Sequence, residues 1–205
     1  MNKSRLEAFS DGVFSIAITL LVFNITIPTC DYAHLSQTLI EMLPKILSYV
    51  MTFTLIGLYW IGHHFYFDRI KSVDGNFVWM NMLLLLLICI MPFPTGLLGR
   101  FPYQVIPLIL YGINLIATNV LSFFMLMYLY KHKHLVNEHF KDEFYKKQLP
   151  LFFWMNSAYL IGIGCAFIYP VVSYILYIAV MGVGVKIYVK RMNVAAELRK
   201  EEMKH

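Results

Sequence analysis

Residues 5–27 read RLEAFSDGVFSIAITLLVFNITI, an apolar stretch that carries ionisable side chains near its start. About 20 residues of helix cross the hydrocarbon core of a bilayer, and Pro28 closes the stretch. No small-x-small cleavage site follows, so we expect the segment to be retained rather than removed as a secretory signal. It therefore predicts a first membrane-spanning helix over about residues 9–27.

The rest of the chain has the composition of a membrane protein. Of its 205 residues, 59% are hydrophobic and only 14% are charged, whereas a soluble domain carries about a quarter charged residues. The apolar blocks predict an all-α integral membrane protein, a single domain over residues 1–205 with six spans in each subunit. We expect the spans at residues 9–27, 43–67, 77–98, 103–130, 149–169 and 171–189.

The basic residues indicate how the chain lies in the membrane. With a cytoplasmic N-terminus, every Lys and Arg except Lys45 and Arg100 falls in a cytoplasmic segment. Cytoplasmic loops carry an excess of these residues, so we expect a multi-pass protein of the cell (plasma) membrane with both termini cytoplasmic. The basic residues form no stripe with interleaved aromatic side chains, and nucleic acid is therefore not an expected partner.

The first span differs from the other five because it carries a carboxylate, Asp11, within its first turns. Two interpretations stay open. Asp11 is either an interfacial carboxylate stabilised by the helix dipole, or a member of a buried network, since a carboxylate at membrane depth is costly unless it is paired.

Candidate partners for Asp11 lie at a similar depth in the first three spans. Hydroxyl, imidazole, indole and carboxamide groups can satisfy one another and a carboxylate in low dielectric. His63 is favoured over His64, because it follows Trp60 by three residues and shares its helix face, whereas His64 fits an interfacial position. We expect a structural hydrogen-bond network rather than a catalytic site. Its candidate members are Arg5, Ser10, Asp11, Trp60, His63, His64 and Asn81.

One face of the first helix carries a stripe of mostly apolar residues at helical spacing. The stripe consists of Gly12, Ile16, Thr19, Leu20, Phe23 and Ile27. Ordinary packing against neighbouring helices explains such a stripe, and periodicity alone favours that explanation. The functional interpretation is a pore wall, in which apolar side chains gate by dewetting and a threonine hydroxyl offers oxygen to ions.

Arg-x-x-x-Phe-Ser-Asp at residues 5–11, followed by Gly-Val-Phe-Ser-Ile-Ala-Ile-Thr-Leu-Leu-Val, resembles the opening signature of the lysosomal/endosomal potassium channel family and its bacterial single-repeat homologues. Residues 59–64 (YWIGHH), Asn81 and residues 92–93 (PF) are also similar to that family. The likeness is close over the first half of the chain and rests on hydropathy alone in the second half.

The resemblance implies six spans per repeat and, for a chain with one repeat, a homotetramer in which four first helices line a central pore. It implies a potassium-selective or weakly potassium-selective channel that conducts potassium ions passively, with other monovalent cations as further candidates. The hydrophobic constriction maps to Ile16, with Leu20 and Phe23 further along the pore, and selectivity maps to Thr19. Phe23 stands where the family leads us to expect leucine.

Other classes of protein stay open. A proton- or sodium-coupled secondary transporter would use Asp11 as its ion site and predicts paired discontinuous helices, for which Pro92 and Pro94 are a weak hint. A membrane-embedded enzyme would need a metal-binding or multi-carboxylate cluster within the spans. The sequence has no such motif, so we expect no enzyme, no catalytic residues, no cofactor and no metal. A scaffold without transport also stays open.

Overall fold

The computed structural model describes residues 2–26, 28–137 and 142–202, of which residues 142–147 and 191–202 are described by their backbone alone. Helices predominate, as expected in lipid, where every backbone N–H and C=O has to be paired within the protein. The elements are α1 (Lys3–Leu20), η1 (Leu21–Asn24), η2 (Tyr32–His34), α2 (Leu35–Glu41), α3 (Leu43–Phe67), α4 (Gly75–Ile90), α5 (Pro92–Arg100), α6 (Val105–Lys131), η3 (Lys133–Leu135), α7 (Asp142–Ala166) and α8 (Pro170–Glu202).

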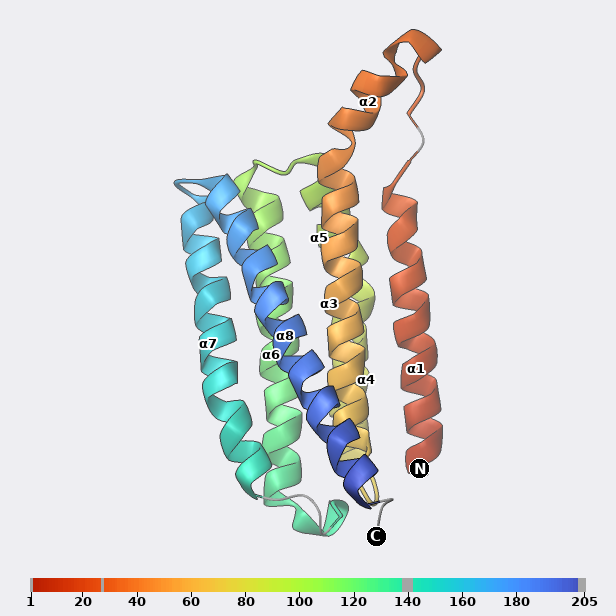
Figure 1. Cartoon of the computed structure of the whole chain (residues 1–205), viewed down its shortest axis with the longest axis vertical. Coiled ribbons are helices and arrows are strands. Elements are labelled where there is room, and N and C mark those ends of the chain that lie inside the picture. The colour runs from red at the N-terminus through yellow and green to blue at the C-terminus, as the bar shows by residue number, and fades with distance from the viewer. Residues whose placement is uncertain (1, 27, 138–141, 203–205) are drawn as a thin grey trace.

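Within the described ranges, six helical segments are long and apolar enough to cross a membrane. They run over Lys3–Asn24, Leu43–Phe67, Gly75–Arg100, Val105–Lys131, Gln148–Ala166 and Pro170–Lys190. The segments form one elongated bundle, and the start of α1 and the end of α8 lie at the same end of it (Figure 1). The fold is therefore all-α with six candidate membrane spans, the number that the sequence predicts.

The helix bounds differ in places from those expected. The third expected span, residues 77–98, is divided at Met91 into α4 and α5, because Pro92 has no N–H with which to continue the helix. The last helix, α8, continues beyond residue 189 to Glu202. The expected end of the first span at Ile27 and residues 138–141 of the polar segment lie outside the described residues.

Local sequence signals set several helix starts. Asp74 is the N-cap of α4, and its carboxylate accepts a hydrogen bond from the backbone N–H of Phe77 at 2.9 Å. The same carboxylate accepts a 2.6 Å hydrogen bond from the hydroxyl of Tyr128, so the cap also joins α4 to α6. Proline occupies the first turn of α3 and of α5, where its missing N–H removes no helical hydrogen bond.

Two apolar clusters hold the helices together. The larger cluster centres on the buried rings of Tyr111, Tyr159 and Tyr177 and includes residues of α1, α3 and α4. The smaller cluster includes Leu6 and Phe67 and lies toward the end of the bundle where α1 begins. Through these clusters α1 packs against α3 and α4, which fixes the helix that carries the candidate site.

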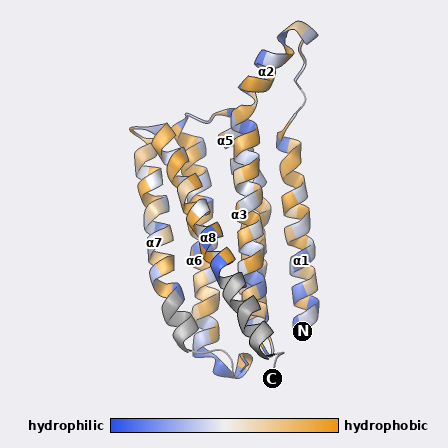
Figure 2. Ribbon diagram, viewed as in Figure 1, coloured by the Kyte–Doolittle hydropathy of each residue, from blue (hydrophilic) through white to orange (hydrophobic). Residues whose placement is uncertain are grey.

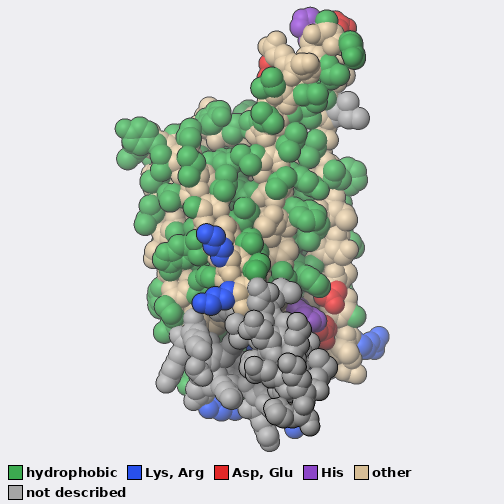
Figure 3. Space-filling model, in the orientation of Figure 1, with side chains coloured by type: hydrophobic (Ala, Val, Ile, Leu, Met, Phe, Trp, Pro, Cys, Tyr) green, Lys and Arg blue, Asp and Glu red, His purple; other side chains and the backbone are tan. Residues whose placement is uncertain are grey.

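The outside of the bundle is apolar over most of its length. Hydrophobic residues predominate in the coloured helices of Figure 2, and hydrophobic side chains cover much of the upper part of the face drawn in Figure 3, where the visible Lys and Arg lie in the lower half. Large side chains such as Ile113, Phe153 and Ile161 are exposed. A soluble monomer rarely presents so large an apolar surface, and lipid accommodates it. The chain is thus a multi-pass membrane protein.

Candidate functional site

Helix α1 has one face buried in its own subunit and one face turned outward. The buried face consists of Leu6, Ser10, Phe14 and Ala17, followed by Leu21 of η1. On the opposite face Ile16 is 59% exposed and Phe23 of η1 is 75% exposed, and Leu20 and Thr19 are exposed between them. The stripe that the sequence singles out is therefore not the face with which α1 packs on its neighbours in the subunit.

The hydroxyl of Thr19 lies on this outward face. It donates a hydrogen bond to the carbonyl of Ile16, one turn earlier, at 2.9 Å. This bond uses the hydroxyl proton and fixes the direction of the Oγ1 atom. The oxygen keeps lone pairs that can accept from water or coordinate a cation.

The buried face of α1 is fastened by a chain of three polar side chains. His63 Nε2 on α3 lies 2.8 Å from Asn81 Oδ1 on α4, and Asn81 Nδ2 donates to Ser10 Oγ on α1 at 3.0 Å. Because an amide oxygen only accepts, His63 carries its proton on Nε2. Ser10 donates in turn to the carbonyl of Leu6 at 2.8 Å. All three side chains are buried, so these bonds join α1, α3 and α4 in apolar surroundings.

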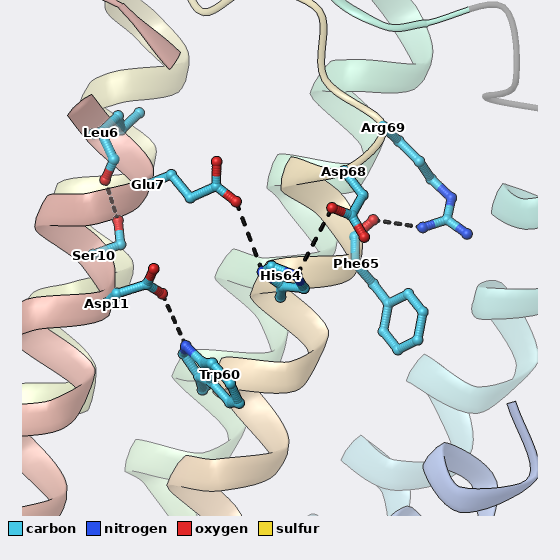
Figure 4. Close-up of polar contacts among 9 residues, drawn as sticks. All are labelled: Leu6, Glu7, Ser10, Asp11, Trp60, His64, Phe65, Asp68 and Arg69. Carbon is cyan, nitrogen blue, oxygen red and sulfur yellow. Dashed lines mark hydrogen bonds and ion pairs between the residues drawn. The ribbon is translucent and has the colours of Figure 1, made fainter. Parts of the chain in front are cut away.

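Asp11 makes a hydrogen bond that is not part of this buried chain of side chains. Its carboxylate accepts a hydrogen bond from the indole N–H of Trp60 at 2.9 Å, in a more exposed position between α1 and α3 (Figure 4). The members expected in one network thus form two sets. Ser10, Asn81 and His63 make the buried set, and Asp11 with Trp60 makes the exposed pair.

Two members expected from the sequence lie elsewhere. Arg5 is exposed and, in the described part of the chain, makes no hydrogen bond or ion pair with Asp11. Six residues of α-helix turn the chain by about 240°, which separates Arg5 from Asp11 around the helix axis. His64 lies between two carboxylates that sequence reasoning missed, Glu7 at 3.7 Å and Asp68 at 3.8 Å (Figure 4).

A further contact holds the far end of the first span. Asn24, one residue after Phe23, donates its side-chain N–H to the carbonyl of Pro92 at 2.9 Å, at the break between α4 and α5. Gly96 makes room for this side chain, because a Cβ atom there would lie 2.6 Å from Asn24 Oδ1. The sequence signal for this contact is a polar residue at the end of an apolar stretch and a glycine one turn after a proline.

An all-helical bundle with six candidate membrane spans defines the class as a multi-pass membrane protein. The family model described as Endosomal/lysosomal potassium channel TMEM175 matches residues 5–92. A potassium channel of Chryseobacterium sp. is 32% identical over 177 residues, which cover 84% of this chain and 87% of that protein. The chain belongs to the TMEM175 family.

Two further comparisons agree with this assignment. A potassium channel of Streptomyces collinus is 41% identical over 103 residues, which cover 49% of this chain and 50% of that protein. The crystal structure of a lysosomal potassium-selective channel TMEM175 homologue from Chamaesiphon minutus matches with a TM-score of 0.74 at 26% identity, covering 89% of this chain and 96% of that one. These descriptions name ion channels rather than enzymes or coupled transporters.

Proposed function

We propose that this protein is a potassium-selective channel that conducts ions passively through a pore lined by α1. The observation that carries the proposal is the outward apolar face of α1, on which Ile16 and Phe23 leave more than half of their surface exposed. Helix α1 lies at the edge of its bundle (Figure 1). A pore lined by this helix is therefore completed by other copies of the chain.

The assembly we propose is a homotetramer in which four copies of α1 surround one axis. Soluble and membrane homo-oligomers favour closed symmetry, which places the same face of each copy on the axis. The chain carries the Arg-x-x-x-Phe-Ser-Asp signature once, at residues 5–11, which supports a single-repeat member of the bacterial kind. One repeat supplies one pore helix, so four chains supply the four helices.

The residue roles are those that the family resemblance implies, and the exposure of these side chains on one face of α1 supports them. Ile16, Leu20 and Phe23 form the hydrophobic constriction, where a narrow apolar ring disfavours a hydrated ion. Thr19 lies between them in sequence, and its Oγ1 lone pairs offer a ring of oxygen ligands that partly replaces the hydration shell. The selectivity for potassium is assigned to this ring.

The buried bonds of α1 have a structural role in this proposal. Ser10, Asn81 and His63 fix the rotation of α1 about its own axis, and the pair of Asp11 and Trp60 fixes it at the same level from a more exposed position. Rotation of the helix by one residue position would turn the stripe away from the axis by about 100°. The bonds therefore keep the constriction and the threonine ring inside the pore.

We place the channel in the cell (plasma) membrane with both ends of the chain in the cytoplasm. The distribution of Lys and Arg supports this orientation, since only Lys45 and Arg100 fall on the other side. The start of α1 and the end of α8 also lie at one end of the bundle (Figure 1).

Recording from purified protein in a planar bilayer tests this function. With potassium on one side and sodium on the other, a potassium-selective channel gives discrete current steps and a reversal potential displaced toward the potassium equilibrium. A bilayer without protein is the control. Transport without current steps, or a reversal potential near zero, would contradict the proposal and favour a coupled transporter or an unselective pore.

A further inference from the structure

We propose that Glu7, His64 and Asp68 form a binding site for a divalent transition-metal ion that fastens the start of α1 to the end of α3. One ligand atom from each residue, a ring nitrogen or a carboxylate oxygen, lies within 4.8 Å of the other two. His64 lies between the two acids, with Glu7 of α1 on one side of its ring and Asp68, directly after α3, on the other (Figure 4). The site lies outside the outward stripe of α1 and does not depend on the proposed pore.

The candidate ligand atoms lie somewhat farther apart than the ligands of a loaded site. Ligands at about 2.1 Å from a tetrahedral ion lie roughly 3.4 Å from one another. His64 Nδ1 lies 3.7 Å from Glu7 Oε1, and His64 Nε2 lies 3.8 Å from Asp68 Oδ1. The imidazole faces one carboxylate with each nitrogen, so binding of an ion requires one of the two carboxylates to turn toward the other nitrogen.

The imidazole is held in place by its neighbours. Its ring stacks on the indole of Trp60, with centroids 6.1 Å apart and planes inclined by 28°. The indole is fixed in turn by its hydrogen bond to Asp11 at 2.9 Å. Asp68 follows His64 by one helical turn, which places both on one face of the chain at the end of α3. Ligands oriented by packing lose little freedom when an ion binds.

The charges also favour a cation. Glu7 and Asp68 have no Lys or Arg within 4.0 Å among the described residues, and His64 is the ion-pair partner of both. With a neutral imidazole, the two carboxylates have no cationic partner among the described side chains. One nitrogen and two carboxylate ligands suit ions such as Ni²⁺, Co²⁺ and Zn²⁺, whereas Mg²⁺ prefers oxygen ligands alone.

The competing explanation is a pair of ion pairs through a protonated His64. Side-chain exposure is 53% for His64, 53% for Asp68 and 25% for Glu7, and ion pairs at such exposure contribute little. That explanation predicts no affinity for a transition metal beyond the rest of the surface. The two explanations therefore differ in one measurable property.

Ni²⁺ titration of Trp60 fluorescence separates them. The tryptophans are Trp60, Trp79 and Trp154, so Trp79→Phe with Trp154→Phe in the full chain leaves Trp60 as the reporter. Ni²⁺ bound beside His64 is close enough to quench the stacked indole. We expect saturable quenching, relieved by Zn²⁺ and not by the same concentration of Mg²⁺, and at least about tenfold weaker binding after His64→Gln.

The controls make the result decisive. His34→Gln removes an exposed histidine on the other end of the bundle and should leave the titration unchanged. Glu7→Gln and Asp68→Asn, one on each helix, should each weaken binding if His64→Gln does not fold. Quenching that rises linearly without saturation, that survives all three substitutions, or that Mg²⁺ relieves as well as Zn²⁺ would overturn the metal site.

Discussion

Asn81 on α4 donates its side-chain N–H to the hydroxyl of Ser10 on α1 at 3.0 Å, and both side chains are fully buried. The oxygen of the same amide lies 2.8 Å from His63 Nε2 on α3. One side chain thus joins three helices at a depth where a lost hydrogen bond is not replaced by water. Because these bonds set the rotation of α1, they also decide which of its faces points outward.

Replacing Asn81 by alanine should destabilise the fold by about 1–3 kcal/mol, because His63 and Ser10 then lose their buried partner. Thermal unfolding in detergent measures the change. Asn76→Ala is the matched control, since Asn76 is exposed and, within the described residues, makes a single long side-chain bond, at 3.4 Å to Tyr128. An equal loss of stability in the two variants would show that the buried hydrogen bonds contribute no more to stability than an exposed one.

A smaller side chain at the proposed constriction should increase ion flux. Ile16→Ala removes three carbon atoms from each copy and widens the ring, so an ion loses less of its hydration shell on passing. We expect a several-fold rise in potassium flux from liposomes, since each 1.4 kcal/mol or so taken from a barrier gives about tenfold in rate. Ile161→Ala makes the same change on an exposed face of α7. A rise in both variants would point to leakage through a loosened bundle.

Removing the hydroxyl of Thr19 should reduce the preference for potassium over sodium. Thr19→Ala deletes the proposed ring of oxygen ligands, and the reversal potential under a potassium/sodium gradient should move toward zero. Thr19→Ser keeps the hydroxyl and its bond to the Ile16 carbonyl, and it should retain most of the preference. If alanine leaves the reversal potential unchanged, selectivity arises elsewhere.

Asn24 and Gly96 should behave as a coupled pair. Gly96→Ala places a Cβ atom 2.6 Å from Asn24 Oδ1, and relief of this clash breaks the bond to the Pro92 carbonyl. We expect a loss of about 1–3 kcal/mol in thermal stability. In an Asn24→Ala background the same substitution should cost much less. Additive effects of the two substitutions would rule out the contact.

The sequence predicts the helices because composition and hydropathy in lipid leave few alternatives. The six apolar stretches and the placement of Lys and Arg determine an all-helical bundle before any packing is known. The division of the third span at Met91 is harder to foresee, since proline is tolerated in membrane helices where other groups satisfy the freed backbone.

The sequence predicts which polar residues are buried better than it predicts the hydrogen-bond partner of each. Ser10, Asn81 and His63 are unusual residues for a buried position, and that alone singles them out. Which residues pair, however, depends on where each lies around its helix axis, and Arg5 and Asp11 lie on different sides of α1. Glu7 and Asp68 look like ordinary interfacial acids in the sequence. Asp68 lies one helical turn after His64, whereas only the approach of α1 to α3 brings Glu7 to His64.

The central claim is that the stripe of α1 faces a shared aqueous axis, and cysteine accessibility at Ile16 tests it most directly. In a background without Cys30, Cys89 and Cys165, Ile16→Cys channels in a planar bilayer are exposed to a charged, water-soluble thiol reagent. Ile161→Cys is the control, because Ile161 is 58% exposed on α7, which packs against α6 and α8. We predict that the reagent blocks current through Ile16→Cys and leaves Ile161→Cys conducting. Current that survives modification at Ile16, or that is lost equally at both positions, would contradict a pore lined by this face of α1.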